Sequence, residues 1–274
     1  MKYCIDLQKT SILDDVDEIA IDYDRKNLNT IKYIQERPQK RFILNILDLT
    51  ESLEYKDIEK LNAIYEENSD INFAIKLPMY YEILDELLPT LKVPFFFQKV
   101  VTNWEDFLGY ISLGVSDIYI GEDLGFELDK VSKIAKEHNI QIRTFPNIVQ
   151  TQWKYTSSLK SFFIRPEDVE LYEQYIDVLE FWGDRHKQPT FYKIYAIDKK
   201  WYGDLQEIIT GFSAKLDSKF TIPRFSEKRV RCGRSCLKGG ICQLCDRIEE
   251  LSKTLEKADI VVDYKKKKED EVNG

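Results

Sequence analysis

Short apolar runs of β type alternate along the chain with longer amphipathic stretches of helical type. The runs are almost continuously apolar, as expected of strands that are covered on both faces. We predict eight strands: EIAIDYD (18–24), RFILNILD (41–48), NFAIKLP (72–78), PFFFQKVV (94–101), DIYIGED (117–123), IQIRTFP (140–146), SFFIRP (161–166) and DVLEFWG (177–183). Because helical stretches separate most of them, the pattern favours parallel strands joined by helical crossovers.

Helical periodicity is clear between several of these runs. The predicted helices include 52–68, 103–114, 126–139 and a last barrel helix at about 203–212. In the third of these, Asn139 is suited to end the helix. Its apolar positions fall on one face at 3.6 residues per turn: Leu128, Val131, Ile134 and Ala135.

Eight strands joined mostly by helices predict a TIM-type (β/α)8 barrel over residues 1–212. The earlier run KYCIDL (2–7) is too close to 18–24 for a helical crossover, so we predict a hairpin strand that caps the bottom of the barrel. An open doubly wound sheet is the main alternative. Its nucleotide-binding form is disfavoured because no strand is followed by GxGxxG or GxxxxGK[ST].

Seven polar side chains stand near the carboxyl ends of predicted strands, each on a different one. They are Asp22, Asn45, Lys76, Gln98, Arg143, Arg165 and Glu180. Alternation along each strand turns all of them inward in one choice of register, and a slip by one residue reverses that choice. A buried charge is costly unless it is paired or used, so the set predicts either a neutralising structural network or a site at the barrel mouth.

The residue types suggest roles if the set forms a site. The substrate-binding group is then Arg143, Arg165, Asn45 and Gln98, and the catalytic group is Lys76, Glu180 and Asp22. The two arginines can clamp a carboxylate or phosphate through paired hydrogen bonds. The lysine can act as a base or nucleophile, and the two carboxyl groups can transfer protons.

Four of the five cysteines fall in one segment, RCGRSCLKGGICQLCD (231–246), with the spacing C-x3-C-x5-C-x2-C. We predict that Cys232, Cys236, Cys242 and Cys245 bind one metal centre, because thiolates are soft ligands for zinc and iron–sulfur clusters. So compact a run slightly favours an iron–sulfur cluster over zinc, since structural zinc usually takes two cysteine pairs set further apart. Free thiols and two disulfides are the remaining alternatives.

An apolar stripe follows the cysteines on a final predicted helix. Its members are Leu244, Ile248, Leu251 and Leu255, and we expect it to pack on the barrel. Residues 213–262 are therefore predicted to form a cysteine module with its helix. The charged tail 263–274 is predicted to be disordered.

Composition narrows the class of protein. The net charge is −8, so the chain as a whole is not a basic nucleic-acid binder, although local basic patches remain possible. The N-terminus lacks the pattern of a signal peptide and no apolar run reaches membrane-spanning length, which predicts a cytoplasmic protein without a membrane partner. The compartment is then reducing, where clustered cysteines are more often metal ligands than disulfides.

With two histidines and neither a GxSxG nor an HExxH motif, a histidine-dependent triad is disfavoured.

The segment GVSDIYIGEDLGFELDKVSKIAKEHNIQIRTFPNIV (114–149) resembles a repeat unit of the collagenase-like peptidase family. That family consists of TIM-barrel proteins, several with cysteine-bound iron–sulfur clusters, that act in RNA or quinone hydroxylation or are classed as peptidases. The resemblance implies the barrel and makes a cluster plausible. It implies no catalytic residue, because the family's cysteine-containing glycine motif after an E-x-F strand is matched only at its beginning, by Glu180–Gly183, and no cysteine follows before Cys232.

Two functional hypotheses follow. The first is an enzyme-type barrel, a hydrolase, hydroxylase or lyase, that binds an anionic or polar substrate at its mouth and carries the four-cysteine centre. The second is a non-catalytic structural or interaction protein whose zinc-type cysteine module, with its basic flank, docks RNA or a protein partner. Convergence of the inward polar set would favour the first hypothesis.

Overall fold

The structure is a computed structural model that describes eleven parts of the chain. They are residues 1–6, 15–23, 29–46, 55–67, 71–78, 84–121, 123–149, 158–212, 225–230, 232 and 243–254. Among these residues, no helix is long and apolar enough to cross a membrane.

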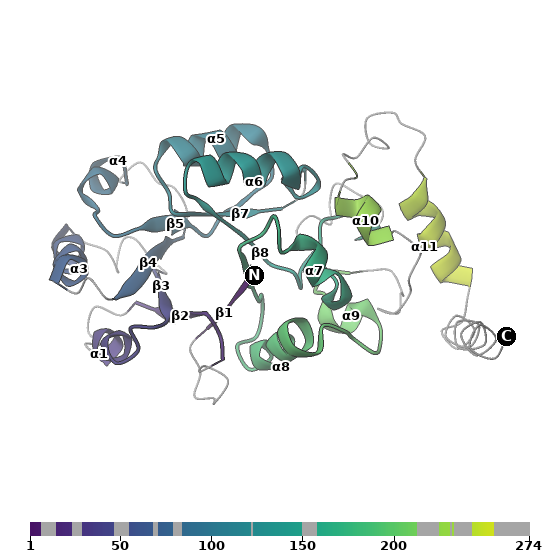
Figure 1. Ribbon diagram of the computed structural model, residues 1–274, viewed down its shortest axis with the longest axis horizontal. Helices are drawn as coiled ribbons and strands as arrows, with labels where there is room; N and C mark the ends of the chain where they lie inside the picture. Colours follow the sequence, from purple (N-terminus) through teal and green to yellow (C-terminus); the bar gives the residue numbers. More distant parts are fainter. Residues whose placement is uncertain are drawn as a thin grey trace.

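The strands of the described residues form one curled parallel sheet in the order β5-β4-β3-β2-β1-β9-β8-β7-β6 (Figure 1). Their bounds are β1 Lys2–Asp6, β2 Glu18–Asp22, β3 Arg41–Asn45, β4 Asn72–Leu77, β5 Phe95–Phe97, β6 Val100–Val101, β7 Asp117–Ile120, β8 Gln141–Thr144 and β9 Val178–Glu180. The two edge strands follow one another in the chain, with only Gln98 and Lys99 between them. The predicted α/β architecture with parallel strands is therefore confirmed, while closure of the barrel stays a prediction.

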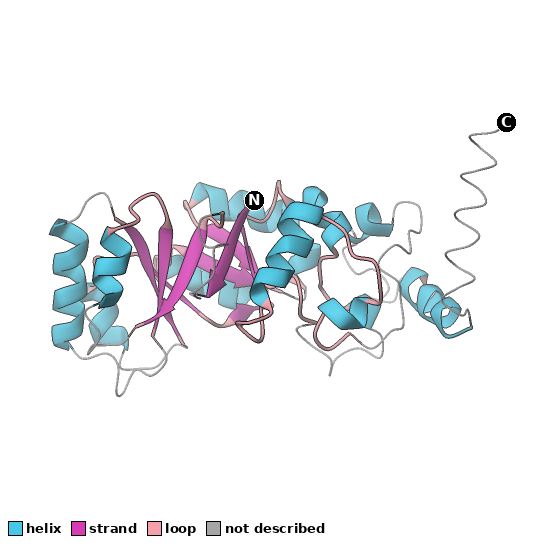
Figure 2. Ribbon diagram, turned by 90° about the horizontal axis from the view of Figure 1, so that it is seen from below, coloured by secondary structure: helices cyan, strands magenta, loops and turns pink. Residues whose placement is uncertain are grey.

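Helices cover the outside of the curled sheet, except for the last two, which lie to one side of it (Figures 1 and 2). Their bounds are α1 Asn29–Gln35, α3 Tyr55–Glu67, α4 Leu84–Leu87, α5 Trp104–Ser112, α6 Leu128–Glu137, α7 Val169–Tyr172, α8 Gln188–Tyr192, α9 Leu205–Ile208, α10 Phe225–Val230 and α11 Leu244–Thr254. Shorter 3-10 turns are η2 Leu88–Thr90, η3 Leu124–Phe126, η4 Ser158–Lys160 and η5 Pro166–Asp168, and η6 Lys193–Asp198 is a π-helix.

The longer helices begin and end where the sequence predicts. α5 starts after Asn103, whose side chain accepts a hydrogen bond from the backbone N–H of Asp106 at 2.9 Å, as a helix cap should. After α6, Asn139 takes the left-handed conformation (φ 57°), which ends the helix. The predicted last barrel helix is shorter than expected, since only 205–208 are helical.

Tyrosines from three helices meet phenylalanines on the outward face of the sheet. The pairs are Tyr33–Phe42, Tyr65–Phe73 and Tyr110–Phe97, with ring centroids 6.0, 5.7 and 5.0 Å apart. The phenylalanines are at most 2% exposed, and burying one such side chain stabilises the fold by about 1.5 to 3 kcal/mol. These contacts fix α1, α3 and α5 against β3, β4 and β5 and leave the inner face of the sheet to other side chains.

The prediction for the first strand is wrong. Residues 2–6 form β1, which lies in the middle of the sheet and pairs in parallel with both β2 and β9. Cys4 and Ile5, on opposite faces of β1, are both fully buried, which an end-capping hairpin would not achieve. The prediction failed because we assumed that a crossover between parallel strands needs a helix, and the connection from β1 to β2 is short.

The prediction of a strand at 161–166 is also wrong, since these described residues form none. Phe162 and Phe163 are buried because they pack between neighbouring segments, edge-on against Phe126 and Phe212. The apolar run 161–166 therefore belongs to the hydrophobic core without being a strand. β1 takes its place among the eight strands that the sequence predicted.

The C-terminal helix α11 packs beside η4. Ile248 is 1% exposed and Leu244 lies partly buried against the core, as the predicted stripe requires. Lys160 forms an ion pair with Asp246 at 2.5 Å across the contact. The side chain of Leu251, and Leu255 altogether, lie outside what the structure describes, as does the tail 263–274.

Replacing Gly125 by alanine is expected to lower the free energy of unfolding by about 1 to 3 kcal/mol, because the added methyl group would overlap the buried ring of Phe162. The matched control is Gly109→Ala in α5, where no atom lies within 4 Å of the new methyl group. This second change should stabilise the protein by about 0.5 to 1 kcal/mol through helix propensity. Urea unfolding of both variants checks the pair, and equal effects would contradict the packing described for Gly125.

Candidate functional site

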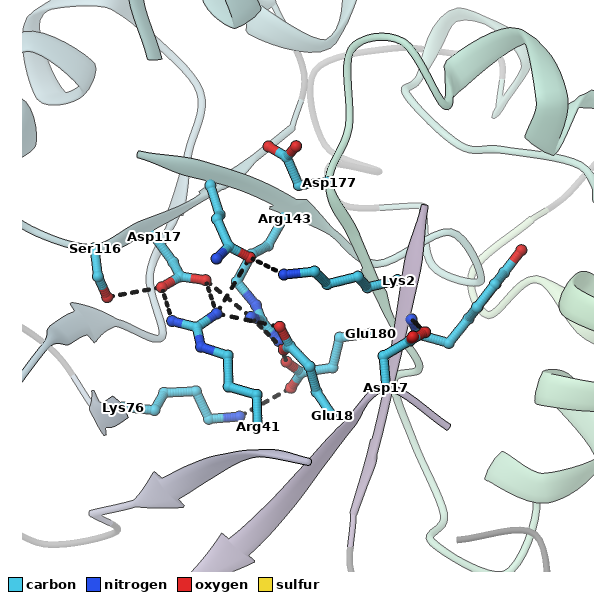
Figure 3. A network of polar contacts seen from close by, with 12 residues as sticks. Lys2, Asp17, Glu18, Arg41, Lys76, Ser116, Asp117, Arg143, Asp177 and Glu180 are labelled. Atoms are coloured by element: carbon cyan, nitrogen blue, oxygen red, sulfur yellow. Dashed lines mark hydrogen bonds and ion pairs between the residues drawn. The ribbon is translucent and has the colours of Figure 1, made fainter. Parts of the chain in front are cut away.

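The inner face of the sheet is filled by charged side chains that contact one another across the curl. Arg41 on β3 donates to Asp117 on β7, with Nη2–Oδ2 at 2.6 Å, although four other strands stand between them in the sheet order. Arg143 on β8 likewise reaches Glu18 on β2, with Nη1–Oε2 at 2.7 Å. Figure 3 shows these side chains pointing toward one another from different strands.

Arg143 is the centre of this network and is fully buried. Its Nη1 also lies 2.9 Å from Asp117 Oδ1, and its Nη2 lies 3.1 Å from Glu180 Oε2. Lys76 Nζ donates to the other oxygen of Glu180 at 2.9 Å, and the hydroxyl of Tyr119 donates to Glu180 Oε2. We call Glu18, Arg41, Lys76, Asp117, Arg143 and Glu180 the inner charge network; its three cations balance its three carboxylates.

The network changes the protonation of its members. Burial raises the pKa of Asp117, but the hydrogen bonds and charges of Arg41 and Arg143 outweigh it and lower the pKa to about 2. Burial likewise opposes ionisation of Glu180, whereas Lys76 and Arg143 lower its pKa to about 2. Burial, followed by the charge of Glu180, raises the pKa of Tyr119 well above its usual value. Both carboxyl groups therefore stay ionised and Tyr119 stays protonated at neutral pH.

Above the network, at the carboxyl ends of the strands, lies a cavity of about 260 Å³. Carboxyl ends of parallel barrel strands are where such folds build their sites. Five of the residues predicted for the mouth line this cavity: Asp22, Asn45, Lys76, Gln98 and Glu180. The structure thus brings together side chains from β2, β3, β4, β9 and the segment between β5 and β6.

The two predicted arginine clamps do not line the cavity. Arg143 lies below it, and its guanidinium is engaged by Glu18, Asp117 and Glu180. Arg165 does not belong to a strand and pairs with Asp168 at 2.7 Å, since residues 161–166 run outside the sheet. Arg143 therefore points inward as predicted but is not a clamp in the cavity, and the strand position predicted for Arg165 is wrong.

Sequence reasoning missed eight cavity residues. They are Asp6, Ile46, Phe145, Phe181, Trp182, Gly183, Arg185 and Gln188. Asp6 ends β1 in the sequence CID just as Asp22 ends β2 in AID, so placing 2–6 in the barrel would have found it. Arg185 and Gln188 come from the connection after β9, and no pattern in the sequence marks them.

A hydrogen-bonded wall joins these residues. Gln188 donates to Asp6 Oδ2 at 2.9 Å and accepts from the backbone N–H of Asp6 at 2.7 Å. Arg185 bridges Asp6 and Asp22, at 3.5 and 2.5 Å, and Asn45 donates to Asp22 Oδ1 at 3.2 Å. Burial raises the pKa of Asp6, although the hydrogen bond from Gln188 works against the rise.

Two polar groups of the cavity wall have unused hydrogen-bonding capacity. Asn45 is 6% exposed, yet its Oδ1 has no hydrogen-bond partner among the described residues. Lys76 is equally buried and, within the same residues, its ammonium donates only to Glu180. A buried acceptor or donor without a partner costs on the order of 1 to 3 kcal/mol, so both groups favour a bound polar molecule.

Two contacting aromatic rings also line the cavity. Trp182 is 42% exposed and packs edge-on against Phe145 at 5.3 Å. The side chain of the fully buried Asn147 donates to the backbone C=O of Trp182 at 2.8 Å and accepts from its N–H at 2.9 Å. This two-point contact fixes the backbone that carries the indole at the cavity rim.

The cysteine prediction falls partly outside the described residues. Cys232 and Cys245 are partly buried and pack against the core, but Cys236 and Cys242 lie in segments that the structure does not describe. In the part that it does describe, no three potential metal ligands come together. Cys4, the fifth cysteine, is a fully buried thiol in β1.

Comparison with known proteins gave no relatives: no protein-family model matches the sequence, and no curated protein is significantly similar to it.

Proposed function

We propose that the protein is an enzyme-type (β/α)8 barrel that binds a small polar substrate in the cavity at the carboxyl ends of its strands. One observation carries the proposal. Lys76 and Asn45 face the same cavity from neighbouring strands. Among the described residues, the ammonium of Lys76 donates only to Glu180, and Asn45 Oδ1 has no hydrogen-bond partner. Buried polar groups that converge on one concave space are the usual mark of a ligand site.

Closure of the barrel is part of this proposal. β5 and β6 act in it as one broken strand, whose first half pairs with β4 and whose second half pairs with β7. A further hydrogen bond, from the N–H of Ser116 to the C=O of Phe95 at 2.8 Å, links β5 to the start of β7 and supports this reading. The ring would then have eight strands, as a TIM barrel requires.

The side chains suit chemistry in which a proton moves and negative charge develops on oxygen. Lys76, oriented by Glu180, can stabilise such an oxygen. Asp6, with its raised pKa, is better suited to transfer the proton than Glu180, whose low pKa keeps it ionised.

A ligand panel tests the proposal. Thermal unfolding is measured with small carboxylates, phosphates, amines and polyols, for the native protein and for Lys76→Met. At least one class should stabilise the native protein by about 2 to 3 kcal/mol at a hundredfold excess over its Kd, and Lys76→Met should lose the effect.

The control is Lys92→Met, which removes an exposed lysine paired with Glu66 far from the cavity lining. Gln98→Ala provides a second cavity variant in case Lys76→Met folds poorly, because Gln98 is exposed. The proposal fails if every stabilising compound acts equally on the native protein and on both cavity variants.

The proposal also retains a metal centre, an iron–sulfur cluster or zinc, on Cys232, Cys236, Cys242 and Cys245. Their spacing supports it, as does the partial burial of the first and last of them against one core. A centre with four protein thiolates has no open ligand position, so it would be structural or transfer electrons.

Protein purified without oxygen is expected to contain stoichiometric iron and sulfide, or zinc, and Cys242→Ser should lose most of that metal. The reason is that three thiolates bind the centre far more weakly than four. Cys4→Ala, which changes the one cysteine outside the cluster, should keep its metal. Elemental analysis of the three proteins decides the matter, and a metal-free native protein would contradict the prediction.

A further inference from the structure

We infer that the cavity takes a neutral, polyhydroxylated ring such as a monosaccharide or cyclitol, stacked on Trp182 and hydrogen-bonded to Lys76 and Asn45. The inference rests on the proposed function, because it names the ligand class of the same cavity. It depends on three properties of the wall: its paired charges, its unmet hydrogen bonds and its exposed aromatic face.

The charges of the wall are already paired with one another. Lys76 is held by Glu180, and Arg185 is shared between Asp6 and Asp22. The five side chains sum to a formal charge of −1. An anionic ligand would meet three carboxylates, and a cationic ligand would meet an ammonium and a guanidinium. A neutral ligand avoids both penalties.

The unmet hydrogen bonds are of opposite kinds. Within the part of the chain that the structure describes, Lys76 has N–H groups without an acceptor, whereas Asn45 Oδ1 has no donor. A hydroxyl group donates one hydrogen bond and accepts two, so adjacent hydroxyls on a ring can serve both residues. Gln98 lines the same cavity and adds an amide that can both donate and accept.

Trp182 supplies a flat apolar surface at the rim, and Asn147 holds its backbone in place. The C–H face of a sugar or cyclitol ring can pack on such a surface while its hydroxyls point into the polar wall. Size agrees as well. A cavity of about 260 Å³ leaves room for a single ring of this kind.

Saturation-transfer NMR on the full-length protein tests the inference with inositol, xylose and glucose, beside a hexose phosphate and glucosamine. We expect a neutral ring to bind with saturable signals on its C–H protons, at a Kd of about 1 mM or tighter. Trp182→Ala should weaken binding by about tenfold or more. The matched control is Tyr202→Ala, which removes another exposed aromatic outside the cavity lining and should leave binding unchanged.

The outcomes separate this inference from the proposed function. Binding of the phosphate or amino sugar alone would overturn the neutral class and leave the cavity as a ligand site. The same conclusion would follow if the only compounds that bound were those of the broader panel that are neither sugars nor cyclitols, provided that Lys76→Met abolishes their binding. A neutral ring that binds Trp182→Ala and the native protein equally would overturn the stacking on Trp182. If no compound of either panel binds more weakly to Lys76→Met or to Gln98→Ala than to the native protein, the inference and the proposed function both fail.

Discussion

Replacing Arg143 by methionine is expected to lower the free energy of unfolding by about 3 to 5 kcal/mol, the largest effect of any single change considered for this protein. The variant removes a fully buried guanidinium that contacts Glu18, Asp117 and Glu180. The three carboxylates would keep only Arg41 and Lys76 as cationic partners within the network. Equilibrium unfolding in urea measures the loss.

Lys92→Met is the matched control, because it also removes one partner of an ion pair, with both side chains more than half exposed. Exposed ion pairs contribute about 0 to 1 kcal/mol to stability, so Lys92→Met should change the free energy of unfolding very little. Arg143→Lys keeps the positive charge but not the paired N–H groups, and we expect an intermediate stability. A loss below that of the control would mean that the inner charge network does not depend on Arg143.

Acidification is expected to destabilise the protein progressively between about pH 5 and pH 2. Asp117 and Glu180 have pKa values lowered from 3.8 and 4.5 to about 2 in the folded protein. A carboxyl group with a lowered folded pKa contributes stability above its unfolded pKa and loses it as the pH falls through the folded pKa. At about 1.4 kcal/mol per pKa unit, the two groups contribute roughly 2 and 3 kcal/mol.

The two contributions are not independent, because Asp117 and Glu180 share Arg143, and we expect a combined loss of roughly 3 to 5 kcal/mol. Asp6 acts in the opposite direction, since its raised pKa makes protonation favourable in the folded state. The test is the midpoint of thermal unfolding as a function of pH for the native protein and for Glu180→Gln. The variant should show a shallower acid dependence, and identical slopes would contradict the assignment of Glu180.

The sequence identified residues whose charged side chains conflict with the apolar strands around them. Lys76, Arg143 and Glu180 stand out because each interrupts an apolar strand, and the structure places all three on the inner face of the sheet. Helix bounds could be predicted from the sequence equally well, because the N-terminal cap at Asn103 and the C-terminal stop at Asn139 depend only on residues nearby in the chain. Arg165 shows the limit of this reasoning, because the same argument fails once its segment proves not to be a strand.

Which charged side chains pair with one another across the sheet could not be predicted from the sequence in the same way. The partners of Arg143 come from β2, β7 and β9, whose order in the sheet no local pattern encodes. For the same reason, the sequence suggested both a clamp and a structural network for this arginine and did not choose. Arg185 and Gln188 reach the cavity only because the connection after β9 lies over the ends of β1 and β2.

The amino-acid sequence by itself determined the alternation of parallel strands and helices, the helix ends and three of the inward charges, Lys76, Arg143 and Glu180, because periodicity, capping and the cost of burying charge act locally. The other three members of the inner charge network, Glu18, Arg41 and Asp117, were not predicted. The tertiary structure decided that β1 is a central strand, which charges neutralise one another and which groups are left unpaired around a cavity. Those outcomes depend on distances between residues far apart in the chain, and such distances are fixed only when the sheet curls and its inner side chains meet.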